Sequence, residues 1–116
     1  MSKSKTPALR RFEADMHRLL TTLMQREVDD PMLLAMSITR FELMDAQGHA
    51  IAYVHSMLTE DKDEAVKRLN SLRSHFLHLL RKAIPKKRLP ELEFRWDDAL
   101  DKTHRVLDTI KELKTS

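Results

Sequence analysis

The chain has no cysteine, a single glycine and few aromatic side chains, and each scarcity excludes something. Without cysteine there is no disulfide framework and no thiol nucleophile, which suits a reducing compartment. The longest apolar runs, such as residues 32–36, are far too short to span a bilayer, and no apolar segment follows the lysine- and serine-rich start to form a signal peptide. We therefore expect a cytoplasmic protein that has no membrane partner.

Only six of the 116 residues are aromatic, and most of them occupy positions that the apolar periodicity turns toward a core. A sheet surface that stacks bases on aromatic rings, as RRM domains use, is therefore not expected. The apolar fraction of 41% and the charged fraction of 34% are typical of a globular protein, and the length fits one core. We expect a flexible N-terminus over residues 1–6 and a single domain over residues 7–114.

Acidic residues are absent between Glu64 and Glu91, although this interval holds eight basic residues. Its formal charge is +8 against +3 for the whole chain, so the remainder of the chain carries −5. A surface that gathers cations without balancing carboxylates attracts polyanions, and nucleic acid is the first candidate. The basic residues of the interval are Lys67, Arg68, Arg73, Arg81, Lys82, Lys86, Lys87 and Arg88.

The first predicted element is a helix that begins at Thr6-Pro7. A threonine hydroxyl can cap free amides, and proline loses nothing at the first helical position. Apolar residues then recur at 3.6-residue spacing up to about Glu27. Asp30-Pro31 ends this helix, because the residue before a proline is pushed out of the helical region.

A β-hairpin is predicted next. Apolar residues alternate with period two over residues 35–44 and again over 50–58, and residues 45–49 between them have turn composition. The alternation slips locally around Thr39-Arg40. Both strands therefore turn one apolar face toward the same core.

The second half of the chain predicts a helix, a strand and a last helix. Acidic residues precede an apolar stripe over residues 65–83, as a helix N-terminus favours, and Pro85 ends that helix. Residues 89–96 alternate as a third strand, after which Asp97 or Asp98 caps the last helix. That helix carries Leu100, Leu107, Ile110 and Leu113.

Arg73 falls inside the apolar arc of the 65–83 helix, which covers roughly 160°. Either its stem lies along the core edge with the guanidinium turned to water, or the helix breaks near Leu72-Arg73-Ser74 and restarts with a new phase. We favour the break, because Ser71 and Ser74 are mediocre helix formers.

This order of elements, with a broken helix before the third strand, resembles the type II KH domains that bind RNA. We therefore expect an α+β fold, a KH-like (type II) domain with a three-stranded sheet packed on helices in the order α-β-β-α-(kink)-α-β-α. KH domains usually grip RNA through a GXXG loop. The only glycine here, Gly48, lies in the hairpin turn, so this domain lacks GXXG.

The residues also carry a more specific resemblance, to the bacterial ribosome-binding factor A family. The matching segments are residues 25–33 (QREVDDPML), residues 52–54 (AYV), and residues 90–94 (PELEF) with Asp97. Arg11 falls where the family has an arginine at the start of helix one. The resemblance runs from about Arg11 to Leu113.

Two positions depart from the family pattern. The kink motif of the family, alanine-any residue-glycine, aligns with Leu72-Arg73-Ser74, so neither small residue is retained. Lys87 stands where family members place an arginine, three residues before the proline of PEL. This exchange keeps the charge but loses the planar fork that grips phosphate bidentately.

The resemblance implies a non-enzymatic assembly factor that binds the small (30S) ribosomal subunit late in its maturation. It further implies a role in processing and folding the 5′ end of 16S rRNA, with particular need at low temperature. We expect a monomer that uses no cofactor and no small-molecule substrate. The candidate RNA-binding residues are Arg73, Arg81, Lys82, Lys86, Lys87 and Arg88, with Arg68, His75 and Arg11 as a second rank.

Other classes fit less of the sequence. The main alternative is a protein-interaction or regulatory domain whose basic face docks on an acidic protein; DNA binding is weaker, because no helix-turn-helix spacing occurs. His75 and His78 lie at i, i+3, but no third ligand joins them, so no metal site is expected. Asp29-Asp30 precedes Pro31 as a helix stop and has no nucleophile beside it, so no catalytic activity is expected.

Overall fold

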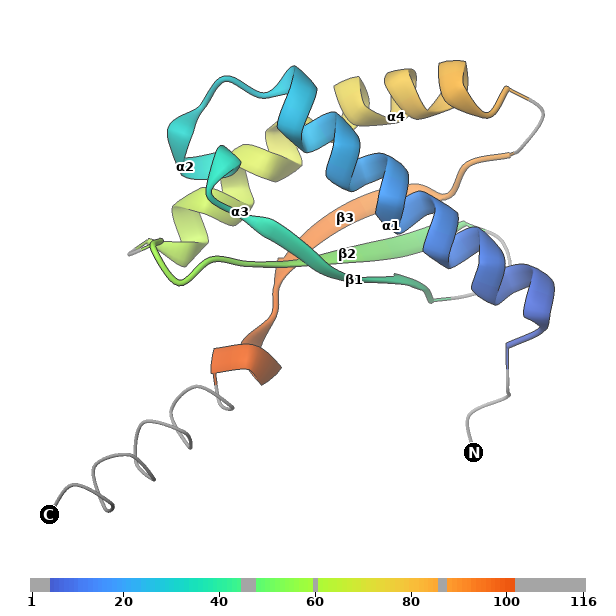
Figure 1. Cartoon of the computed structure of the whole chain (residues 1–116), viewed down its shortest axis with the longest axis horizontal. Helices are drawn as coiled ribbons and strands as arrows, with labels where there is room; N and C mark the ends of the chain where they lie inside the picture. The colour runs from blue at the N-terminus through green and yellow to red at the C-terminus, as the bar shows by residue number, and fades with distance from the viewer. Residues whose placement is uncertain (1–4, 45–47, 60, 86–87, 102–116) are drawn as a thin grey trace, which may run out of the picture.

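The computed structural model describes residues 5–44, 48–59, 61–85 and 88–101. The elements in chain order are α1 (Pro7–Glu27), α2 (Pro31–Leu34), β1 (Ser37–Leu43), β2 (His49–His55), α3 (Lys62–Ser71), α4 (Arg73–Ala83) and β3 (Glu91–Trp96). The predicted α+β fold of the KH-like kind is confirmed, and helices cover one face of a three-stranded sheet (Figure 1). Residues 98–101 form the first turn of the predicted last helix. Its later residues, including Leu107, Ile110 and Leu113, lie outside the described residues.

Both helices of the N-terminal part begin at a proline that follows a capping residue. Thr6 Oγ1 accepts a hydrogen bond from the Leu9 amide at 3.2 Å, and Asp30 Oδ1 accepts one from the Met32 amide at 3.0 Å. At the position after the cap, a backbone N–H would have no partner within the helix. Proline lacks this N–H and therefore loses nothing there. Asp30-Pro31 therefore follows the end of α1, as predicted, and also begins α2, a short helix that was not predicted.

The central strand of the sheet is β2, which pairs antiparallel with β1 and parallel with β3. Phe41 lies opposite Ala52, and Ala52 lies opposite Phe94. The predicted slip is confirmed as a register shift between Ile38 and Arg40. An extra residue at this point lets Ile38 and Phe41 both face the core, although strict alternation would separate them.

The core lies between the sheet and the helices α1, α3 and α4. Phe76 of α4 packs against Phe94 of β3, with ring centroids 5.6 Å apart. Their side chains are 0% and 1% exposed, and full burial of a phenylalanine contributes about 1.5–3 kcal/mol. Ala50 and Ala52 of β2 are also fully buried, and their small side chains let the large ones approach the sheet.

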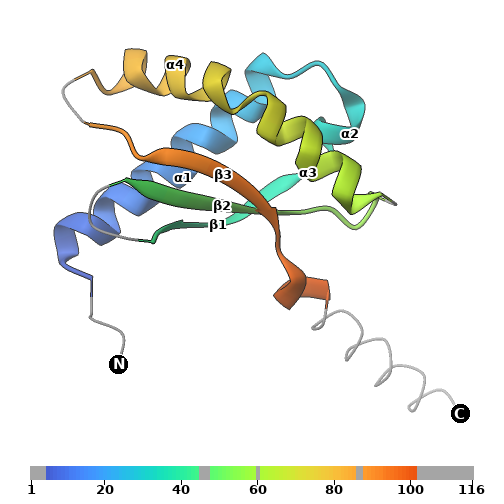
Figure 2. The same ribbon diagram turned by 180° about the vertical axis from the view of Figure 1, so that it is seen from behind.

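The predicted helix break is confirmed at Leu72, whose φ of −98° and ψ of 0° separate α3 from α4. The two helices run in different directions (Figure 2), because α3 packs on β3 whereas α4 packs mainly on α1. Leu69 and Leu80 are both fully buried and eleven residues apart, a spacing that returns to almost the same helical phase. The break therefore redirects the axis without the expected change of phase, and it leaves Arg73 exposed.

Side chains of α1 bind the outer edge of β1. His17 Nε2 donates to the Ile38 carbonyl at 2.6 Å, and the Glu13 carboxylate accepts from the Leu43 amide at 2.8 Å. Lys5 pairs with the same carboxylate. An open edge strand is a template for pairing with another chain, so these contacts protect β1 near both of its ends.

Candidate nucleic-acid interface

The outer side of α4 gathers basic and imidazole side chains. Phe76 and Leu80 are fully buried and fix the inner side of the helix. At 100° per residue, four exposed basic or imidazole side chains fall opposite them within an arc of about 120°. These residues, called the α4 face below, are His75, His78, Arg81 and Lys82.

Two further predicted residues lie beyond the two ends of this face. Arg73 is the first residue of α4, and Arg88 lies in the segment that leads to β3; both are exposed. Lys86 and Lys87, the other members of the predicted loop cluster, lie outside the described residues. The structure thus brings all four first-rank candidates that it describes onto one helix and the loop that follows it.

The cations of this region have no carboxylate beside them. Among the residues that the structure describes, Arg73, Arg81, Lys82 and Arg88 make no ion pair. Basic residues in a last helical turn also interact favourably with the helix dipole, by about 0.3–1 kcal/mol. That effect explains why cations sit at the end of α4, but it gives no reason for the missing carboxylates. An unpaired cation can bind a phosphate oxygen without first losing a partner.

Arg68 of α3 is different, because the fold supplies it with two carboxylates. Its guanidinium lies 2.9 Å from Asp30 and 3.1 Å from Glu64. Hydrogen bonds to Glu64 and then Asp30 raise the pKa of Arg68 above its ordinary value. A phosphate would have to displace these carboxylates, so Arg68 is a poorer candidate than the cations of α4.

Arg11 belongs to α1 and not to the α4 face. It is exposed on the first half of α1, where it lines a shallow hollow with Pro7, Ala8, Phe12 and Asp15. All of these residues belong to α1 itself. Arg11 therefore lies on a different helix from the first-rank candidates.

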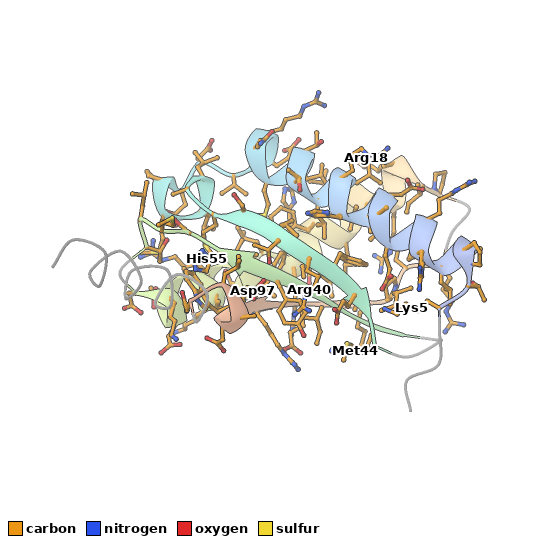
Figure 3. The ribbon with its side chains drawn as sticks, turned by 60° about the horizontal axis from the view of Figure 1, so that its bottom comes forward. Lys5, Arg18, Arg40, Met44, His55 and Asp97 are labelled. Carbon is orange, nitrogen blue, oxygen red and sulfur yellow. The ribbon has the colours of Figure 1, made fainter. Side chains whose placement is uncertain are left out.

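Cations on the opposite face of the sheet are neutralised within the fold. The Arg40 guanidinium lies 3.2 Å from the Glu42 carboxylate and 4.2 Å from the centroid of the Tyr53 ring. Arg95 pairs with Glu93, and this hydrogen bond lowers the pKa of the Glu93 carboxyl. Figure 3 shows Arg40 over the sheet on the side turned away from α4. This face carries cations but little unbalanced charge.

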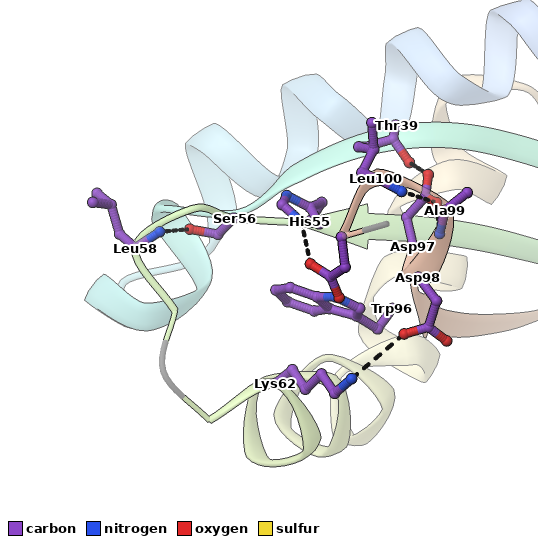
Figure 4. A network of polar contacts seen from close by, with 11 residues as sticks. Thr39, His55, Ser56, Leu58, Lys62, Trp96, Asp97, Asp98, Ala99 and Leu100 are labelled. Atoms are coloured by element: carbon purple, nitrogen blue, oxygen red, sulfur yellow. Dashed lines mark hydrogen bonds and ion pairs between the residues drawn. The ribbon is translucent and has the colours of Figure 1, made fainter. Parts of the chain in front are cut away.

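A polar cluster joins the ends of β2 and β3 (Figure 4). The Asp101 carboxylate accepts hydrogen bonds from Trp96 Nε1 at 2.6 Å and from His55 Nε2 at 2.8 Å. Burial opposes the ionisation of Asp101, but these hydrogen bonds outweigh it and lower the pKa of the carboxyl. Asp97 accepts from the Thr39 hydroxyl at 2.6 Å. Because these groups bind one another, the cluster anchors the turn after β3.

Within the described ranges, no three histidine, cysteine or acidic side chains are grouped so that they could hold a metal ion. Across the same ranges, no helix combines the length and the apolar content needed to cross a membrane.

Two residues that bear on this interface were not among the predicted candidates. His78 lies at the middle of the α4 face, and a helical projection alone would have found it opposite the buried side. Asn70 binds the backbone of β3 through its side chain. Periodicity gives no signal for Asn70, because its partner is 24 residues away in the sequence.

The family model of ribosome-binding factor A matches residues 8–110, most of the chain. The chain belongs to the ribosome-binding factor A family. The ribosome-binding factor A of Xylella fastidiosa is 30% identical over 113 residues, which cover 97% of this chain and 90% of that protein. The factor from Mycoplasmoides gallisepticum is 27% identical over 114 residues, which cover 98% of this chain and 93% of that protein.

Solved structures of ribosome-binding factor A share the fold. The crystal structure of the factor from Thermus thermophilus matches with a TM-score of 0.67 at 24% identity, over 76% of this chain and 93% of that one. A homology model of the Thermus thermophilus factor, fitted into a cryo-EM map of a 30S complex, matches with a TM-score of 0.64 at 25% identity and the same coverage. The predicted family is therefore confirmed, whereas the RNA contacts of single residues stay a prediction.

Proposed function

We propose that this chain binds the small ribosomal subunit and contacts 16S rRNA through the α4 face, Arg73 and the loop up to Arg88. The observation that carries the proposal is the contrast in pairing: the described cations of α4 and its loop have no carboxylate partner, whereas Arg40, Arg68 and Arg95 each have one. The related Thermus thermophilus factor, fitted into a map of a 30S complex, supports the choice of partner.

The proposed contacts read the shape of the RNA. Cations on a helix bind phosphate oxygens, which orients a protein on RNA without reading bases. The nearest phenyl ring, that of Phe76, is buried beneath this face and cannot stack on a base. A shape-reading domain can hold one RNA arrangement and disfavour others by occupying the site.

The finer role is the one that the resemblance to the family implies. Bound late in maturation, the domain favours the mature arrangement of the 5′ end of 16S rRNA, covers sites needed for initiation, and must then be released. It breaks no bond and uses no cofactor or small-molecule substrate. We place this activity in the cytoplasm, with residues 7–114 acting as one monomeric domain and with the greatest need in the cold.

Sedimentation with purified subunits tests the partner. The protein should move with the small subunit in dilute buffer and leave it after ribonuclease treatment. A complex that survives ribonuclease would instead indicate an acidic protein partner, and no association at all would refute the proposal. Deletion of the gene should then cause precursor 16S rRNA and free subunits to accumulate, most strongly in the cold.

The loop is tested by changing Lys86, Lys87 and Arg88 together to alanine. Each phosphate contact contributes a log-log salt slope of about −0.7 to −0.9, so the slope should flatten by about two to three. Thermal stability should stay nearly unchanged, because Arg88 is exposed. An unchanged slope would remove the loop from the interface.

A further inference from the structure

Asn70 is bonded to β3 as a residue of a neighbouring strand would be. Its side-chain amide donates to the Phe94 carbonyl at 3.0 Å, and its side-chain oxygen accepts from the Phe94 amide at 2.9 Å. β3 is an edge strand with β2 on one side only. One side chain thus satisfies both backbone groups that Phe94 turns away from β2, and it fixes the end of α3 at one point along the strand.

The residues at the helix break do not break a helix by themselves. Leu72 is a good helix former, and its φ is negative. The Ser71 hydroxyl bonds back to the Arg68 carbonyl at 2.6 Å, a contact that can bend a helix but does not end one. The Leu72 amide bonds to the Leu69 carbonyl at 3.0 Å, which closes α3 with a tighter turn, and α4 begins without a side-chain cap. Contacts with the rest of the fold must therefore set the place of the break.

Phe94 supplies such contacts on both sides of the break. Its backbone holds Asn70, two residues before Leu72, and its ring packs against Phe76, four residues after Leu72. In this structure the two contacts with Phe94 are made by helices that run in different directions on either side of Leu72. The strand therefore fixes the end of α3 and the start of α4 independently.

We infer that Asn70 is a positioning residue for the α4 face. By holding the end of α3 on β3 it sets the direction in which α4 leaves, and so the surface that its cations present. That Asn70 sets the direction of α4 concerns the protein alone. That this direction matters for RNA binding rests on the proposed function. Asn70 thereby specifies the break in a chain that has Leu72 and Ser74 at the small-residue positions of the family motif.

The test variant is Asn70→Leu, which keeps the size of the side chain and removes both hydrogen bonds. Residual dipolar couplings should show a changed angle between α3 and α4. Exchange of the Phe94 amide should accelerate by about tenfold or more, as expected for a lost hydrogen bond. Affinity for small subunits should fall by about fivefold or more, although every cation of α4 is retained, because loss of a single phosphate contact has an effect of this size.

Two further variants keep the test decisive. Ile51 lies between Ala50 and Ala52 on β2 and is 1% exposed. Ile51→Val removes one methylene from this buried side chain. It should destabilise the fold but leave the helix angle and the affinity unchanged. Asn70→Asp keeps the acceptor for the Phe94 amide but sets a carboxylate oxygen against the Phe94 carbonyl, so it should also change all three readouts and serves as the test if Asn70→Leu fails to fold.

The outcomes separate the two steps. Unchanged couplings in both Asn70 variants would overturn the inference. A changed angle with unchanged affinity would overturn the link to RNA, and an equal loss of affinity in Ile51→Val would assign the effect to stability. If the unmodified protein fails to bind subunits, the proposed function fails, and the couplings alone then decide whether Asn70 directs α4.

Discussion

The arginines of α3 and those of α4 belong to the same basic stretch of sequence, yet the fold treats them differently. Arg68 of α3 lies within 3.1 Å of two carboxylates, from Asp30 and Glu64. Arg73 and Arg81 of α4 are exposed and have no carboxylate partner in the described part of the chain. The +8 counted along this stretch of sequence therefore overstates the positive charge that its surface offers to a partner.

The inner side of α4 should matter most, because it holds the unpaired cations in place. Leu80→Ala removes a fully buried side chain and should cost about 2–5 kcal/mol of unfolding free energy. That is a large part of the 5–15 kcal/mol typical of small domains. Chemical denaturation measures it. His78→Ala, on the outer side, should stay within about 0.5 kcal/mol of the unmodified protein; equal losses would contradict the assigned inner and outer sides.

The next largest effect should come from the unpaired cations themselves. Changing Arg73, Arg81 and Lys82 together to alanine should weaken subunit binding by about 10²-fold near 0.1 M salt and flatten the log-log salt slope by about two to three. The physical reason is the loss of three phosphate contacts. Binding titrations over a range of salt concentrations measure both quantities.

A matched triple variant removes the same charge from paired positions, namely Arg18, Arg40 and Arg95. These side chains neutralise nearby carboxylates, so their loss should change affinity only through the net charge of the protein. Similar losses in the two triples would mean that total charge, and not the α4 face, determines binding.

Arg68→Ala should have a smaller effect on binding and a visible one on stability. Affinity should change by less than about threefold, since a true phosphate contact would contribute more at this salt concentration. The melting temperature should fall, because Asp30 and Glu64 lose their shared partner. Lys67→Ala, at the exposed neighbouring position, is the control for stability. A large affinity loss with an unchanged melting temperature would make Arg68 an RNA contact after all.

The smallest expected effect is the pH dependence of the Asp101 contacts. The pKa of Asp101 is lowered in the fold, so its stabilising contribution is complete above the ordinary carboxyl pKa of about 3.9 and is lost as pH falls through the lowered value. The unfolding free energies of the protein and of Asp101→Asn should therefore differ at pH 6 and converge below about pH 4. If the difference in unfolding free energy grew as the pH fell, the pKa of Asp101 would be raised by folding and not lowered.

The sequence revealed those features whose causes are local. The start of α1 follows from Thr6-Pro7, and the shift at Thr39-Arg40 follows from a change in alternation. The short helix α2 was missed because four residues give no periodicity. The break at Leu72 was predicted from the position of Arg73 and from weak helix formers, although it lies beside a long-range contact of Asn70 that no local pattern contains.

The candidate site divides in the same way. Helical projection predicts the α4 face, because burial of Phe76 and Leu80 leaves one outer side. Helical spacing could indicate the pair of Arg68 with Glu64, four residues earlier, but not the second partner, because Asp30 lies 38 residues away. Contacts between distant segments are decided by the fold, which single-sequence patterns do not determine.

Directed cleavage of RNA tests the α4 face most directly, and the absence of cysteine makes it simple. His78→Cys on the α4 face and Arg40→Cys on the opposite face of the sheet can each carry a single iron chelate that releases hydroxyl radicals. Bound to small subunits, the probe at residue 78 should cut 16S rRNA at a defined site, and the probe at residue 40 should cut it weakly or not at all. Cleavage from residue 40 with none from residue 78 would contradict the assignment of the RNA-binding surface to α4.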